Sequence, residues 1–447
     1  MSQFELPDSW AFTTISEVAI KGDQRAPDQD ETFTYVDIGS IDRVLKRISD
    51  PQILMGKNAP SRARKAIRNG DVLVSLTRPN LNAVALVTSE FDGQIASTGF
   101  EVIRPCLVDS RYIFGLTRSK EFIDSISGAV QGALYPAAKS SDVQGFKFPL
   151  PPLAEQKIIA DKLDTLLTQV ESIKARLERI PEILKQLRQS VLAAAVSGKL
   201  TEEWEGYDWQ DMTIGEIAKV RTGKTPSRTE EKYWENGVIP WLTSSVTGSE
   251  YCFKADEFIS ELASKECNLK PFPVGTLLLA MYGEGKTRGQ VTELKLEATC
   301  NQACAAIIPN NEIALTSFVK LKLQENYEAI RLAASGGNQP NLNLNKVREI
   351  NIQVPTLEVQ IKIVQEVEKL LTISEEVNQQ VRSALDRVNN LTQSILAKAF
   401  RGELTAEWRE ANPELISGEN SAKALLERIK AERASVKPAT KRGRGKA

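Results

Sequence analysis

The residues that could do nucleotide chemistry lie in two short glycine-containing segments. Gly223-Lys224-Thr225 and Gly285-Lys286-Thr287 each resemble the end of a Walker phosphate-binding loop. Such a loop also needs a glycine five residues before the second one, and those positions hold Ala218 and Ala280. The backbone could not form the usual phosphate seat, so these segments do not predict nucleotide hydrolysis.

The sequence offers no other catalytic or metal-binding constellation. Histidine is absent, which excludes Ser-His-Asp and Cys-His catalysis and HExxH zinc sites. Cys300 and Cys304 are four residues apart without a second pair, so they do not predict zinc. Glu284-Gly285-Lys286 matches the end of a nuclease motif but has no convincing upstream acid, and the Asn-Pro-Pro-aromatic motif of amino-methyltransferases is missing. We expect a non-catalytic chain that binds no metal or cofactor.

Basic and polar side chains recur in loops at matching places in both halves of the chain. Arginine and asparagine can each form two hydrogen bonds with the edges of guanine and adenine, respectively. The candidate DNA-binding residues are Arg62, Arg64, Lys65, Arg68, Thr77, Arg78, Asn80 and Asn82 in the first half, and Lys219, Arg221, Lys224, Arg228, Tyr282, Lys286, Thr287, Arg288, Gln290, Asn338 and Gln339 in the second.

These loops have two interpretations. Each residue taken alone is equally consistent with a solvated loop, and a net charge of −1 gives no global attraction to nucleic acid. Taken as a set, the matched loops favour DNA contact. Phosphate contacts would then position each half, and the Arg, Asn and Gln side chains would specify bases.

Two long helices, expected over 151–204 and 355–408, must position these loops. The two segments align without a gap, with Pro151 on Pro355, an offset of 204 residues. A period this long indicates one large duplicated unit. Further shared positions are Gln156/Gln360, Leu166/Leu370, Leu187/Leu391, Gln189/Gln393, Ser190/Ser394, Gly198/Gly402, Thr201/Thr405 and Trp204/Trp408.

Both segments carry a heptad pattern of apolar residues, typical of the seam of a left-handed coiled coil. Matched seams favour packing of the two helices on each other; the alternative is that each packs on an unrelated globular surface. Pro181 predicts a kink or break in the first helix. Gly198 predicts the C-terminal end of the first helix, and Gly402 predicts that of the second. The seam residues are Ile159, Leu163, Leu166, Val170, Ile173, Leu177, Leu184, Leu187 and Val191, then Ile363, Val367, Leu370, Val377, Val381, Val388, Leu391 and Ile395.

Each long helix follows a globular module of similar plan. Short strand-like pieces separated by glycine-containing turns predict an α+β fold with a mixed, largely antiparallel sheet and flanking helices. We expect a first module over 1–149, a first long helix over 150–205, a second module over 206–353 and a second long helix over 354–410. A short helix and a basic, disordered tail would occupy 411–447.

Composition is that of an ordinary soluble protein, with 41% hydrophobic and 26% charged residues in 447. No stretch predicts a membrane span or signal peptide, so we expect a cytoplasmic protein. The five irregularly spaced cysteines are expected to be buried or incidental thiols of a reducing compartment.

At 149–156 (PLPPLAEQ) and 391–405 (LTQSILAKAFRGELT), the chain resembles the specificity (S) subunit of type I restriction-modification systems, and is HsdS-like in layout. The resemblance implies two target-recognition domains, each reading half of an interrupted DNA site, with the helices packed as an antiparallel coiled coil of pseudo-twofold symmetry. It also implies two modification (methyltransferase) subunits that use S-adenosylmethionine and two restriction subunits that use ATP and Mg. The alternative, a coiled-coil scaffold without DNA readout, would explain the helices but not the matched basic loops.

Overall fold

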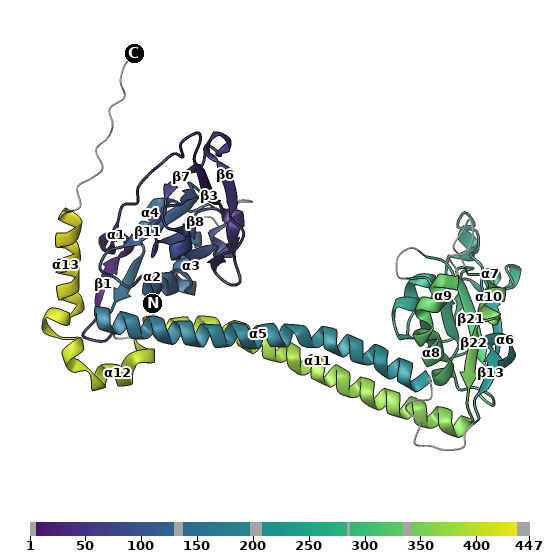
Figure 1. Ribbon diagram of the computed structural model, residues 1–447. Helices are drawn as coiled ribbons and strands as arrows, with labels where there is room; N and C mark the ends of the chain where they lie inside the picture. The colour runs from purple at the N-terminus through teal and green to yellow at the C-terminus, as the bar shows by residue number, and fades with distance from the viewer. Residues whose placement is uncertain (1–5, 129–136, 197–207, 284–286, 334–341, 436–447) are drawn as a thin grey trace, which may run out of the picture. The chain divides into compact units, whose positions relative to one another are not determined.

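The computed structural model describes residues 6–128, 137–196, 208–283, 287–333 and 342–435. The chain divides into two compact units, which we describe separately. Unit 1 is Met1–Glu178 with Arg382–Ala447, and unit 2 is Arg179–Val381. Each of the two long helices therefore contributes one half to each unit (Figure 1).

Unit 1 begins with a module of short strands and helices. Its elements are β1 Ala11–Thr14, α1 Ile15–Val18, β2 Ala19–Ile20, β3 Thr32–Val36, β4 Ile41–Asp42, β5 Arg47–Ile48, β6 Gln52–Met55, β7 Ala63–Ala66, β8 Val72–Ser75, β9 Val84–Leu86, β10 Ile95–Ser97, β11 Phe100–Pro105, α2 Ser110–Thr117, α3 Lys120–Ser127, α4 Ser140–Gln144 and β12 Lys147–Leu150. Helix α5, Leu153–Val196, then begins in unit 1 and ends in unit 2.

Unit 2 repeats this plan. Its elements are β13 Gln210–Thr213, α6 Ile214–Ile217, β14 Ala218–Thr222, β15 Ile239–Leu242, β16 Tyr251–Cys252, β17 Glu257–Ile259, α7 Glu261–Glu266, β18 Leu277–Ala280, β19 Val291–Leu294, β20 Thr299–Cys300, β21 Cys304–Pro309, α8 Thr316–Glu325, α9 Tyr327–Ala333, α10 Leu344–Arg348 and β22 Asn351–Val354. Helix α11, Leu357–Phe400, returns the chain to unit 1, where α12 Ala406–Ala411 and α13 Ala422–Ser435 follow.

The strands of both modules pair mostly in antiparallel fashion, as the sequence predicts. Module 1 has four-stranded sheets ordered β6-β3-β10-β7 and β2-β11-β8-β9, and module 2 has the related orders β17-β15-β20 and β14-β21-β18-β19-β16. The parallel pair β3–β10 has its counterpart in β15–β20. Small antiparallel pairs, β1 with β12 and β13 with β22, join the first and last strands of each module. The two modules are thus one fold used twice.

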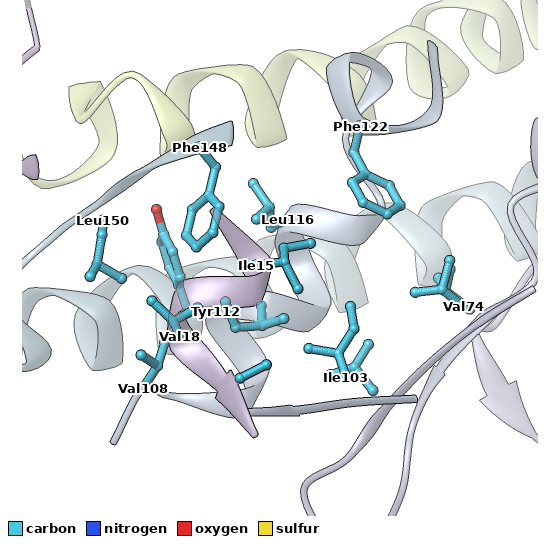
Figure 2. Packing of buried hydrophobic residues seen from close by; sticks show 14 of the residues in the cluster. Ile15, Val18, Val74, Ile103, Val108, Tyr112, Leu116, Phe122, Phe148 and Leu150 are labelled. Atoms are coloured by element: carbon cyan, nitrogen blue, oxygen red, sulfur yellow. The ribbon is translucent and has the colours of Figure 1, made fainter. Parts of the chain in front are cut away.

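The core of unit 1 lies between the small helices and the sheet. Figure 2 shows Ile15 from α1, Tyr112 from α2 and Phe148 from β12 meeting in this core. All three are almost completely buried, and the Tyr112 hydroxyl donates to the carbonyl oxygen of Pro149 at 2.7 Å. A buried hydroxyl needs such a partner, so this contact also fixes α2 against β12.

A buried glutamine ties the start of each long helix to its module. The side-chain amide of Gln156 donates to the Pro151 carbonyl oxygen at 2.8 Å, and its oxygen accepts from the backbone N–H of Asp109 at 3.0 Å. Gln360 repeats this arrangement with Pro355 and Leu315, both at 2.8 Å. The shared Pro and Gln of the repeated segment are therefore explained by one hydrogen-bonded joint.

The two long helices pack on each other within each unit. In unit 1, α5 contributes Leu163, Leu167 and Val170 to the core that contains Ile395 and Ala399 of α11. Unit 2 brings the last turns of α5 against the first turns of α11, with Val191 and Leu192 in the same core as Ile363 and Val367. Since the beginning of one helix meets the end of the other in both units, the helices run in opposite directions.

The predicted seam is not buried along its whole length. Ile173, Leu187 and Leu391 keep 47%, 45% and 44% of their surface exposed, which a continuous seam would not predict. An α-helix of 3.6 residues per turn carries a strict seven-residue stripe gradually around its surface, so Leu167 is buried where Leu166 is only half-buried. The fully buried seam residues are Ile159, Leu163, Val170, Val191, Ile363, Val367, Val381 and Ile395; the half-buried ones are Leu166, Leu177, Leu184, Leu370, Val377 and Val388.

The predicted helix interruptions have different outcomes. The break at Pro181 is wrong, because α5 continues through this residue. Proline removes one N–H and crowds the preceding turn, but 44 consecutive residues supply enough other helical hydrogen bonds to carry the helix past it. Gly402 does end the second helix: α11 stops at Phe400 and Gly402 adopts a left-handed φ of 79°. Gly198 lies outside the described residues.

The segment after α11 closes unit 1 through a buried carboxylate. Glu155, fully buried in the first turn of α5, accepts from the Trp10 indole at 2.8 Å and the Thr405 hydroxyl at 2.6 Å, and it pairs with Arg409. Helix α13 continues along the module beside α1 (Figure 1), where the Arg433 guanidinium donates to the carbonyl oxygen of Glu17. The segment that contains Trp10 and the segment after α11 are thereby part of one folded unit.

We expect the substitution Glu155→Gln to destabilise unit 1 by about 3 kcal/mol, because it leaves the Arg409 charge largely buried without a carboxylate. Hydrogen exchange of the β1 and β12 amides in the full chain measures this change. Glu403→Gln is the matched control, since Glu403 pairs with Arg401 at half-exposed positions and should contribute less than about 1 kcal/mol. Equal effects of the two substitutions would contradict the assignment.

Candidate nucleic-acid interface

The first candidate site is the loop between β8 and β9, residues 77–82, which we call loop 1. The Ser75 hydroxyl donates to the Thr77 carbonyl oxygen at 2.9 Å, and the Ser75 N–H donates to the Ala83 carbonyl oxygen at 3.0 Å. A single 3₁₀ turn, Pro79–Leu81, forms the tip. The loop is thereby closed at its base and exposes Thr77, Arg78 and Asn80.

Two residues that are not glycine hold loop 1 in an uncommon backbone conformation. Arg78 has a φ of 48° and Asn82 a φ of 47°, both in the left-handed region. This region costs roughly 1–2 kcal/mol for a residue with a Cβ, and asparagine tolerates it better than arginine. Buried Asn82 is held by its amide, which donates to the Thr117 carbonyl oxygen at 2.8 Å, and by Lys46, whose amino group donates to the Asn82 carbonyl oxygen at 2.6 Å.

The second module has the same loop between β18 and β19, residues 282–290, which we call loop 2. The Ala280 N–H donates to the Gln290 carbonyl oxygen at 2.9 Å, the counterpart of the Ser75 contact in loop 1. Gly283, with φ of 141°, and Gly289, with φ of 86°, occupy the places of Arg78 and Asn82. The two loops therefore share the closing contact at the base and a positive φ at these two places, and only loop 1 carries side chains there.

The candidate side chains of loop 2 differ in exposure. Tyr282 is 38% exposed, whereas Thr287, Arg288 and Gln290 are half-buried. The Nε of Arg288 is buried and has no hydrogen-bond partner among the described residues. Lys286 lies outside the described residues.

The basic run of module 1 is divided into two groups. Arg62 is exposed. It lies close to loop 1, because its carbonyl oxygen accepts from the Thr98 N–H, and the next residue, Gly99, accepts from the N–H of Leu76 at the base of the loop. Lys65 and Arg68 instead face acids that are distant in the sequence: Lys65 lies 3.2 Å from Glu101, and Arg68 lies 2.6 Å from Asp23. Arg64 donates to the Ala63 carbonyl oxygen and is half-buried.

Module 1 also holds a largely buried cluster of charges around Arg104. Arg104 lies 2.9 Å from Asp71 and 3.1 Å from Asp23. Burial alone would lower the pKa of the Arg104 guanidinium, but the hydrogen bonds and charges of the two carboxylates outweigh it and raise the pKa. This cluster is structural, and its cations are already matched.

The basic residues of module 2 lie along the edge strand β14 and the turn after it. Lys219, Arg221 and Lys224 are exposed. Arg228 is engaged within the chain, because its guanidinium stacks 3.7 Å from the Trp234 ring centre and lies 2.6 Å from Glu257. Its charge is thus already compensated.

The last two candidates, Asn338 and Gln339, lie outside the described residues. Leu342, the next described residue, donates its N–H to the Met281 carbonyl oxygen at 3.2 Å, beside loop 2. Ala138 makes the equivalent bond with Leu76 at 2.8 Å, beside loop 1. In both modules the chain thus returns to the base of the same loop.

The described residues contain no group of three or more side chains suited to hold a metal ion, and none of their helices is long and apolar enough to cross a membrane. Four of the five cysteines are buried, as expected, and all five are free thiols. The contacts that sequence reasoning missed are those of Lys46 and Thr117 with Asn82. These hydrogen bonds join residues that are 35 or more positions apart in the sequence, so no local sequence pattern predicts them.

Comparison with known proteins gives the same result by sequence and by structure. The family model for the type I restriction modification DNA specificity domain matches residues 7–182 and 207–385. The chain is 34% identical to the EcoKI type I restriction enzyme specificity subunit of Escherichia coli strain K12, across 97% of this chain and 98% of that one. It is also 34% identical to the StySPI specificity subunit of Salmonella potsdam, across 97% of each.

Solved structures of similar architecture include the HsdS subunit of Thermoanaerobacter tengcongensis. It superposes with a TM-score of 0.67 at 26% identity, over 90% of this chain and 99% of that one. A chain from work on complex assembly and conformational transition of the type I R-M system gives a TM-score of 0.71, also at 26% identity, over 90% and 100%.

The left-handed conformation of Arg78 can be tested by a pair of substitutions. We expect Arg78→Gly to be more stable than Arg78→Ala by about 1 kcal/mol, because glycine has no Cβ to strain at this φ. Hydrogen exchange of the β8 and β9 amides reports the difference. At Thr77, outside the left-handed region, the order should reverse, with glycine less stable than alanine. The same order at both positions would refute the strain.

Proposed function

Because the chain belongs to the family of type I restriction-modification DNA specificity proteins, we propose that it is the sequence-specific DNA-binding subunit of a type I restriction-modification complex. Each module reads one half of a bipartite, interrupted site. The observation that carries this assignment is the pair of matching loops, each closed at its base and flanked by left-handed residues.

Loop 1 is proposed to enter the major groove. Arg78 and Asn80 are exposed at its tip, and these side chains suit guanine and adenine edges. Tyr282, Thr287, Arg288 and Gln290 supply the corresponding chemistry in loop 2, together with Lys286, Asn338 and Gln339. The unmatched Nε donor of Arg288 supports this role, since a buried donor without a partner is costly unless a ligand supplies an acceptor.

Phosphate contacts are assigned to cations outside the loop tips. Arg62 beside loop 1 and Lys219, Arg221 and Lys224 in module 2 are exposed and suited to this role. The residues Arg64, Lys65, Arg68 and Arg228 are engaged within the chain, so they rank below these four. Such contacts position each module without reading sequence.

The helices α5 and α11 are proposed to form an antiparallel coiled coil that sets the spacing between half-sites and gives the subunit pseudo-twofold symmetry. Leu187 and Leu391 occupy the same position in the two copies and are both nearly half exposed. We assign such outward positions to two modification subunits, which would carry S-adenosylmethionine. Two restriction subunits would use ATP and Mg, so methyl transfer and cleavage belong to the partners, in the cytoplasm.

A scaffold that does not read DNA is the alternative, and the family relationship favours the specificity subunit over it. Adenine-methylation mapping in cells that carry this chain and its partners tests the proposal. The expected result is one bipartite motif with a fixed gap. Absence of any such motif would favour the scaffold.

We expect Arg78→Gln to weaken recognition of one base in one half-site by about 1–3 kcal/mol, that is, to relax specificity there while the other half-site is unaffected. The measurement is affinity of the assembled complex for duplexes changed at single base pairs. Lys219→Gln is the contrast, since a phosphate contact should weaken all duplexes alike. Uniform weakening by Arg78→Gln would contradict base readout by this residue.

The spacer role predicts a longer gap when both helices are extended. We insert seven residues that continue the heptad between Glu178 and Arg179 and between Val381 and Arg382, which adds about 10 Å of helix. Methylation mapping should then show both half-sites unchanged and the gap between them lengthened. An unchanged gap would refute the spacer role, and a matched insertion in the 411–421 segment is the control.

A further inference from the structure

Unit 1 contains a pocket at the corner where module 1 meets the two long helices. We call it the corner pocket; its volume is about 230 Å³. The β4–β5 turn contributes Lys46, the end of α2 contributes Arg118, and α5 contributes Glu171 and Lys174. Gln393 of α11 also lines it, as does Asn82 of loop 1.

The charges that line the corner pocket are unequal. Three cations, Lys46, Arg118 and Lys174, face one carboxylate, Glu171. The Arg118–Glu171 contact is long, at 3.4 Å, and Lys174 lies 3.9 Å from Glu178, one turn further along α5. The lining is therefore positive and suits an anion.

Acids in the surroundings are already committed elsewhere. The Asp42 carboxylate accepts from the backbone N–H groups of Val44 and Leu45, and Asp164 lies 3.1 Å from Arg111. Burial, followed by the charge of Arg118, lowers the pKa of Lys46 to about 8. Within the described residues, the Lys46 amino group donates to the Asn82 carbonyl oxygen. The amino group can therefore donate a further hydrogen bond to a ligand.

The equivalent corner of unit 2 lacks this excess of positive charge. That pocket, of about 300 Å³, is lined by Arg188 from α5 and Glu250, with Gly289 in the place of Asn82. Glu250 lies 3.4 Å from Lys320. The same position in the fold is thus electrically balanced in one module and cationic in the other, so the fold alone does not require the cations of unit 1.

We infer that the corner pocket binds one phosphodiester of the DNA backbone, next to the half-site read by loop 1. The inference rests on the proposed function and adds a specific anchor to it. Asn82 belongs both to loop 1 and to the pocket lining, and Lys46 holds its carbonyl oxygen. A phosphate seated on Lys46 therefore contacts the residue that fixes the base of the reading loop. Lysine and arginine are the usual donors to DNA phosphates.

The test uses the full chain assembled with its modification subunits and a duplex that carries the mapped bipartite site. Single phosphates around the half-site of module 1 are replaced by uncharged methylphosphonates, and each Kd is measured by fluorescence anisotropy. One replacement should weaken wild-type binding about tenfold, the effect of losing a charge-assisted hydrogen bond. The variants are Lys46→Gln and, because Lys46 also holds the Asn82 carbonyl oxygen, Lys174→Gln, whose side chain is one-third exposed.

Each variant should bind cognate and mismatched duplexes about tenfold more weakly, with a salt dependence less steep by about 1. In each variant, the sensitive methylphosphonate should no longer have an effect. Lys120→Gln is the control, since this exposed lysine pairs with Asp124 outside the pocket and should leave Kd unchanged.

Wild-type affinity and salt dependence in both variants would overturn the inference. A variant that binds its modification subunits more weakly, yet binds DNA normally once those subunits are saturating, would also overturn it. The pocket would then bind an acidic surface of a modification subunit rather than a phosphate. A wild-type complex with no preference for the bipartite duplex would refute the proposed function itself, an outcome distinct from the loss of this one contact.

Discussion

The buried amide of Gln156, repeated by Gln360, is the contact on which the geometry of each module depends. The Gln156 side-chain oxygen accepts from the backbone N–H of Asp109, the residue that caps α2, and its nitrogen donates to the carbonyl oxygen of Pro151, just before α5. A buried amide without partners would cost about 1–3 kcal/mol, so helix, loop and module are held in one arrangement. The far end of α2 then holds Asn82 through the Thr117 carbonyl oxygen. Loop 1 is thus positioned by the long helix through α2.

Duplication preserved this joint but allowed its surroundings to diverge. Glu155 in the first turn of α5 corresponds to Val359 in the first turn of α11, and both side chains are fully buried. The carboxylate binds Trp10, Thr405 and Arg409, so it joins the segment before β1 and the segment after α11 to α5. The valine makes an apolar contact instead, in the core of unit 2. A buried charge with several hydrogen-bond partners specifies one arrangement, whereas a buried valine requires only an apolar space of the right size.

Sequence patterns predicted the elements that depend on local periodicity and failed where distant residues decide. The repeated helices, their packing on each other and the end at Gly402 follow from apolar spacing and one glycine. The ion pairs of Lys65 and Arg68 do not, because their acids, Glu101 and Asp23, lie 36 and 45 residues away in the sequence. Continuity through Pro181 also depends on neighbouring turns rather than on the residue itself. The DNA contacts remain predictions for the same reason, because they depend on how loops that are distant in the sequence are arranged together in space.

The left-handed positions of the two loops explain how one fold can present different chemistry. A Cβ on Gly283 would lie 2.9 Å from the Cβ of Thr287, so loop 2 has no room for a side chain there. Loop 1 carries Arg78 at that place despite the strain of its φ. Strained residues persist where the surrounding structure fixes them and are common at functional sites. Since both loops are closed at the base by equivalent backbone hydrogen bonds, the two modules can carry different side chains at this position without a change in the surrounding fold.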